Sequence, residues 1–79
     1  MAVGKKLFHI AIVTNFNIPE KLQDAMQVAE KLLQFGCHVT IPQRGQSRIT
    51  AESPKLAEVI TFLPFEKLYK NLDAVIVLG

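Results

Sequence analysis

Residues 7–36 read LFHIAIVTNFNIPEKLQDAMQVAEKLLQFG, and this stretch decides the fold. Its first part, Leu7–Val13, is apolar on both alternating faces, which is typical of a parallel strand covered on both sides. The apolar spacing then changes to that of a helix with one buried stripe, formed by Leu22, Ala25, Met26, Ala29, Leu32 and Leu33. The stretch therefore predicts a central strand followed by an amphipathic helix.

Both ends of this helix carry end signals. Asn17 and Glu20 have the spacing of a capping box, and Pro19 suits the first turn. Gly36 stands where a helix often ends in a left-handed residue. A second strand follows at Cys37–Ile41, so the sequence predicts one right-handed βαβ unit.

The rest of the chain continues the alternation. Residues 42–53 are mostly polar and predict an exposed connection. A helix is expected from Ser53-Pro54 to Pro64, with apolar residues at Leu56, Val59, Ile60 and Leu63, and one or two helical turns over residues 65–72. The last strand is Asp73–Gly79. We expect an α/β fold in three layers, with an open parallel sheet in the strand order 2-1-3.

Composition limits the possibilities. The chain has 79 residues, is 49% hydrophobic and carries a formal net charge of +2, which fits one small domain, residues 1–79, and does not indicate nucleic-acid binding. The single cysteine, Cys37, excludes an internal disulfide and suits a reducing compartment such as the cytoplasm. No apolar run is long enough to cross a membrane, and no cleavage site follows the basic residues of Met1–Lys6.

The candidate site is the turn between the first strand and the first helix. Asn15 and Asn17 lie at the carboxyl end of a central strand, where ligands bind in open α/β sheets, so both are candidates for nucleotide contacts. The spacing of Asn17 to Glu20 favours helix capping alone for Asn17, which makes Asn15 the better candidate. If the last strand is parallel to the first, Gly79 reaches the same edge and the two flank one crevice. Glycine there allows close approach to a phosphate.

Other patterns are excluded or carry no chemistry. The first turn lacks the glycines of a dinucleotide-binding unit, the hydroxyls of a flavodoxin and the acidic residues of a phospho-receiver domain. His9, His38 and Cys37 show no metal-ligand spacing and are interpreted as structural. Arg44 and Arg48 are interpreted as solvated, although they could hold a phosphate, and Asp73 lies at the wrong end of its strand for catalysis. We therefore name no catalytic residue and no metal ligand.

The order of these features resembles the amino-terminal part of the NAD kinases. The features are the first strand, the turn with Asn15, the helix that begins at Pro19, and the final Asp73-Ala-Val-Ile-Val-Leu-Gly79. In that family the turn is often Asn-Pro, where this chain has Phe16. Gly79 matches the first glycine of the family's Gly-Gly-Asp-Gly motif. The resemblance implies that the chain is the front end of a larger enzyme, whose catalytic aspartate and β-rich, NAD-binding carboxyl-terminal domain lie beyond Gly79.

By this resemblance, the full-length enzyme transfers the γ-phosphoryl group of ATP to the 2′-hydroxyl of the NAD adenosine ribose, gives NADP, uses a divalent metal such as Mg²⁺ and forms a homo-oligomer. Its nucleotide-binding residues within this chain would be Asn15, Asn17 and Gly79. We expect the 79 residues alone to be inactive. Two alternatives remain open: a lipid kinase of the diacylglycerol or sphingosine kinase type, and a non-catalytic α/β binding module.

Overall fold

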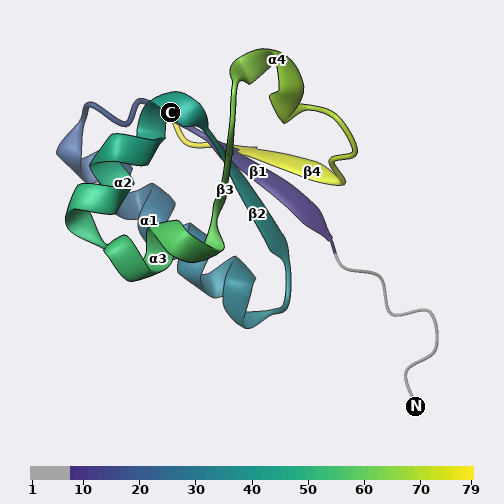
Figure 1. Ribbon diagram of the computed structural model, residues 1–79, viewed down its shortest axis with the longest axis horizontal. Helices are drawn as coiled ribbons and strands as arrows, with labels where there is room; N and C mark the ends of the chain where they lie inside the picture. Colours follow the sequence, from purple (N-terminus) through teal and green to yellow (C-terminus); the bar gives the residue numbers. More distant parts are fainter. Residues whose placement is uncertain (1–7) are drawn as a thin grey trace.

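The computed structural model describes residues 8–79 and shows helices and strands in alternation (Figure 1). The strands are β1 (His9–Val13), β2 (His38–Pro42), β3 (Thr61–Leu63) and β4 (Ala74–Val77). The helices are α1 (Pro19–Gln34), α2 (Gln46–Glu52), α3 (Pro54–Val59) and α4 (Phe65–Leu68), with a 3₁₀ turn, η1, at Gln43–Gly45. Leu7, the predicted start of the first strand, and the Met1–Lys6 segment lie outside the described residues.

All four strands are parallel and form one sheet in the order β3-β2-β1-β4. The predicted order of three strands, 2-1-3, is wrong because a fourth strand, β3, adds to the outer side of β2. The predicted neighbours of the first strand are confirmed, since β1 pairs with β2 on one side and with β4 on the other. Val13 pairs with Val77, so β1 and β4 end together.

Helices cover the sheet unequally. Helices α1, α2 and α3 lie on one side of the sheet and the short α4 on the other (Figure 1). The main core lies beneath the three helices, and its buried members are Ile12, Phe16, Leu22, Ala25, Met26, Ala29, Val39, Ile41, Ile49, Leu56 and Ile60. Leu68 of α4 is also fully buried. The α/β class with helices on a parallel sheet is thus confirmed. Every helix within residues 8–79 is too short or too polar to cross a bilayer.

The ends of α1 differ from the prediction at one side only. The N-cap is Ile18, and no side chain caps the helix, so the predicted capping role of Asn17 is wrong. Pro19 does occupy the first turn. At the other end Gly36 has φ +85°, and its N–H and that of Cys37 donate to the carbonyls of Leu33 and Leu32 at 3.0 Å. These bonds satisfy carbonyls that would otherwise lack partners.

The middle of the chain corrects two further predictions. Residues 42–53 are not an exposed connection, because they form η1 and α2, and Ile49 of α2 is fully buried. The predicted helix from Ser53-Pro54 to Pro64 stops at Val59, and Thr61–Leu63 is strand β3. The apolar residues of this stretch are divided between α3 and β3. Leu56 packs on the core from α3, the backbone of Ile60 is extended, and Phe62 packs on the core from β3.

Candidate functional site

The turn after β1 is organised around Phe16. This side chain is buried in the main core, while its neighbours Asn15 and Asn17 are exposed. The side-chain oxygen of Asn15 accepts a hydrogen bond from the N–H of Asn17 at 3.1 Å, and its carbonyl accepts from the N–H of Ile18 at 3.1 Å. An asparagine that bonds to the backbone two residues on stabilises a turn. The buried ring therefore fixes a turn that holds both amides outward.

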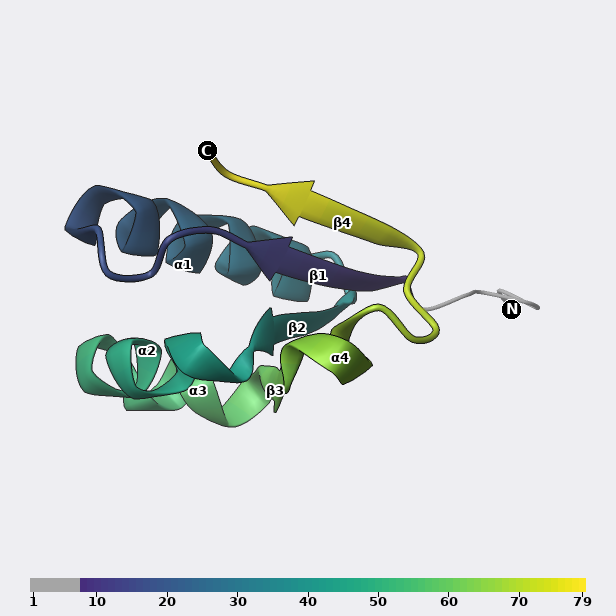
Figure 2. The same ribbon diagram turned by 90° about the horizontal axis from the view of Figure 1, so that it is seen from above.

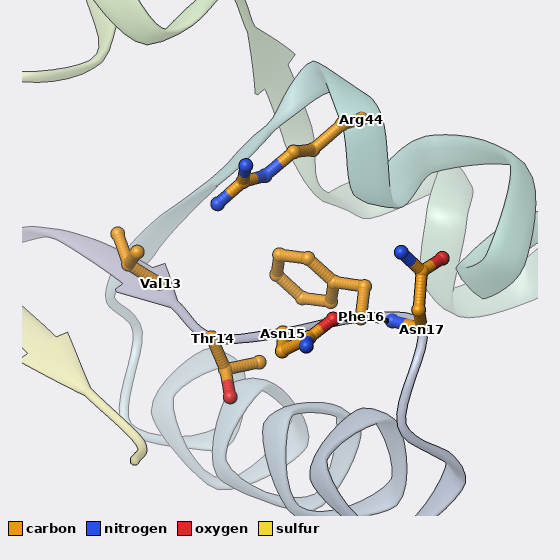
Figure 3. Close-up of a pocket in the computed structure, with 6 residues that line it drawn as sticks. All are labelled: Val13, Thr14, Asn15, Phe16, Asn17 and Arg44. Carbon is orange, nitrogen blue, oxygen red and sulfur yellow. Dashed lines mark hydrogen bonds between the residues drawn. The ribbon is translucent and has the colours of Figure 1, made fainter.

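A glycine brings a second segment to this turn. Gly45, in η1 after β2, is buried, and a Cβ atom there would lie only 3.0 Å from the Phe16 ring. The absence of a side chain thus lets η1 approach the ring closely. As a result, Arg44 extends over the turn, and the Phe16 ring lies between Arg44 and the backbone that carries Asn15 and Asn17 (Figure 3).

These residues surround a cavity of about 520 Å³ at the carboxyl ends of β1 and β2. Its lining consists of Val13, Thr14, Asn15, Phe16, Asn17 and Arg44. The volume lies in the range of small-molecule sites. Among these lining residues there is one cation and no carboxylate. The arrangement suits an anion, and it does not fit a divalent metal ion, which prefers carboxylate oxygens.

Neither the models of known protein families nor the curated proteins match this chain. The resemblance to the NAD kinases therefore depends on the residues that carry it. Asn15 and Gly79 are the two that can be placed, and both lie where parallel strands end. A function is therefore inferred from the positions of these two residues, because no matching protein supports one.

Gly79 reaches the same edge of the sheet as Asn15 but does not line the cavity. Figure 2 shows β1 and β4 pointing the same way, with the carboxyl end of β4 on the side where α1 begins. The hydroxyl of Thr14 donates to the carbonyl of Leu78 at 2.7 Å, and the Lys21 ammonium donates to the carbonyl of Gly79. The side chain of Thr14 points away from Arg44 (Figure 3). Gly79 therefore lies at the same edge of the sheet as the cavity but outside its lining.

His9, His38 and Asp73 lie at the other end of the strands. His9 pairs with His38, their rings are 5.9 Å apart, and the Nε2 atom of His9 lies 2.5 Å from the Thr40 hydroxyl. Asp73 accepts a hydrogen bond from the N–H of His9 at 2.8 Å, which fixes the start of β4. Within residues 8–79 no three His, Cys, Asp or Glu side chains form a metal-binding group, Cys37 included.

Arg44 is the site residue whose part the sequence reasoning underestimated. Both arginines are exposed, as predicted, but only Arg44 lines the cavity. A signal for it was present: Arg44 follows the carboxyl end of a strand that neighbours β1, and such ends meet at one edge. This signal was missed because residues 42–53 were interpreted as an exposed connection.

Proposed function

We propose that this chain is the amino-terminal part of an NAD kinase, which transfers the γ-phosphoryl group of ATP to the 2′-hydroxyl of the NAD adenosine ribose in the cytoplasm. The observation that carries the proposal is the parallel pairing of β4 with β1, which brings Gly79 to the edge that holds Asn15. An antiparallel or distant β4 would have separated these positions. The cavity beside Asn15 adds room for a ligand at the same edge.

The residues present support binding and orientation. The Asn15 amide nitrogen remains available for a ligand because the amide oxygen is already used within the turn. Gly79 leaves space for a close backbone approach, since nothing lies within 4 Å of where its Cβ would be. Phosphoryl transfer depends mostly on positioning and on neutralising phosphate charge. The lining holds no carboxylate, so we assign the attacking-hydroxyl chemistry to residues outside this chain and derive no metal-dependent step.

The test is an NADP-formation assay on a protein in which the natural coding sequence is continued beyond Gly79. We expect NADP from ATP and NAD, and no NADP from residues 1–79 alone. Asn15→Ala in the longer protein should lower kcat/KM about tenfold or more, as loss of a positioning contact would. Activity of the 79-residue chain would contradict the assignment of the chemistry to later residues.

The phosphoryl acceptor separates this proposal from the lipid-kinase alternative. The same longer protein is assayed with diacylglycerol and with sphingosine in place of NAD. Phosphorylation of either lipid without NADP formation would replace the proposal by that alternative. No phosphorylation of any acceptor would favour the non-catalytic binding module.

A further inference from the structure

We propose that the cavity binds a chain of phosphate groups, with Arg44 as its cation and Phe65 as the residue that positions Arg44. The inference rests on the proposed function in one respect: the phosphate chain is taken to be that of the nucleotide. It adds a binding residue and a positioning residue that the resemblance to the NAD kinases does not supply.

The charge of the lining favours an anion. Arg44 faces the cavity, and within residues 8–79 its guanidinium forms no ion pair with a carboxylate. The two asparagines add amide donors on the other side of the cavity (Figure 3). A guanidinium presents several N–H donors in a planar fork that matches phosphate oxygens. The guanidinium and the two amides together offer hydrogen-bond donors at several points of the cavity, as an extended anion requires.

Phe65 holds Arg44 without using its donors. The guanidinium carbon of Arg44 lies 5.1 Å from the centre of the Phe65 ring, which belongs to α4. Tyr69, one turn further along, lies 6.0 Å from the same ring. A cation is attracted to the face of an aromatic ring, whereas its N–H groups stay free for other partners. A carboxylate in the same place would have occupied those donors and cancelled the charge.

A phosphate chain fits better than nucleic acid or a single carboxylate. The chain carries a net charge of only +2, and one arginine faces the cavity, which is too little for a nucleic-acid surface. At about 520 Å³ the cavity is larger than one small carboxylate needs. Several phosphate groups in a row fill such a space and can reach both Arg44 and the asparagine amides.

The test uses inorganic tripolyphosphate, titrated into the 79-residue protein and followed by amide chemical shifts in nuclear magnetic resonance spectra. We expect the shifts to concentrate at Asn15, Phe16, Asn17 and Arg44. Arg44→Gln should weaken binding about tenfold. Arg48→Gln, which removes an arginine from the exposed side of α2, is the matched control and should change affinity less than twofold.

Phe65 is tested by two substitutions and a double variant. Phe65→Leu keeps an apolar side chain but removes the ring, and it should weaken binding about two- to fivefold. Phe65→Tyr keeps the ring and should retain wild-type affinity. The double variant R44Q/F65L should bind no more weakly than R44Q, because a positioning residue has no effect once its arginine is gone. A further loss in the double variant would overturn the positioning role.

The outcomes separate this inference from the proposed function. The inference would be overturned if tripolyphosphate does not bind, if it shifts amides away from the cavity, or if R44Q binds it as tightly as the wild type does. The inference stands if R44Q weakens tripolyphosphate binding about tenfold even when the longer protein makes no NADP, a result that contradicts only the proposed function. Conversely, the longer protein could form NADP while R44Q binds tripolyphosphate as tightly as the wild type does. That result would support the proposed function and contradict the role of Arg44 in phosphate binding.

Discussion

Phe16 and Gly45 together build the candidate site. The Phe16 ring is buried in the core, and Gly45 has no Cβ atom that would push against it. Their contact joins the segment after β1 to the segment after β2, so that Asn15, Asn17 and Arg44 surround one cavity. The site thus depends on a packing contact between two residues that offer no polar group to a ligand.

Gly45→Ala should therefore destabilise the protein. Gly45 has φ −89°, a value that alanine adopts freely, so the cost comes from a methyl group 3.0 Å from the Phe16 ring. We expect a loss of about 1–3 kcal/mol in the free energy of unfolding, as for other overpacked cores. Urea unfolding measures it, with Gly79→Ala, which meets nothing within 4 Å, as control. Equal stability of the two variants would show that the ring moves aside freely.

Gly36 illustrates a different need for glycine. Its φ of +85° lies in the left-handed region, while no atom lies within 4 Å of a Cβ at this position. Gly36→Ala should cost about 1–2 kcal/mol through backbone strain alone. Gly36→Asn should cost less, since asparagine tolerates this conformation. The two variants are compared by thermal unfolding, and an unchanged melting temperature for Gly36→Ala would contradict the strain.

Among the elements, α2 adds most to what the sequence indicated. Its residues are largely polar, yet Ile49 is fully buried and belongs to the main core. The helix covers the core next to α1 and follows directly after the turn that carries Arg44. Ile49 is the buried residue of this seven-residue helix.

Ile49→Ala should accordingly cost about 2–4 kcal/mol in the free energy of unfolding, because it leaves a cavity in the core. Thr50→Ala, at the exposed neighbouring position, should change stability by no more than about 0.5 kcal/mol. Both variants are measured in urea. If Ile49→Ala is no worse than Thr50→Ala, the stretch behaves as the exposed connection that its composition suggested.

The long elements could be predicted, and the short ones could not. Six apolar residues on one face define α1, and largely apolar runs define β1 and β4, so these three elements follow from periodicity. The parallel pairing of β1 and β4 was an expectation from the α/β class and is confirmed. Strand β3 has three residues and α2 has one large apolar side chain, Ile49, which is too little pattern to recognise. Asn15 and Gly79 were placed at the correct edge, whereas Arg44 required knowledge of how residues 42–53 fold.

At the scale of the whole molecule, the two sides of the sheet should unfold together. The main core lies beneath α1, α2 and α3, while Tyr69, the only tyrosine in the chain, follows α4 on the other side. Leu68, next to it, is fully buried. In a domain this small, one cooperative transition is the expectation.

Urea unfolding followed by far-ultraviolet circular dichroism and by Tyr69 fluorescence should consequently give the same midpoint. The first signal reports mainly on the helices and the second on the surroundings of α4. A fluorescence midpoint at clearly lower urea would mean that α4 detaches first, and Leu68→Ala should then shift the fluorescence transition alone.

The bonds at the two ends of β4 have a consequence for its alignment. At its start, Asp73 exchanges hydrogen bonds with the backbone of His9, and at its finish Leu78 is bonded to both Val13 and Thr14. Sliding the strand by two residues, the smallest step that keeps the same side chains facing inward, would break both sets at once. These hydrogen bonds fix the register of β4 against β1, so the backbone after Leu78 leaves the sheet at a defined position relative to the turn after β1.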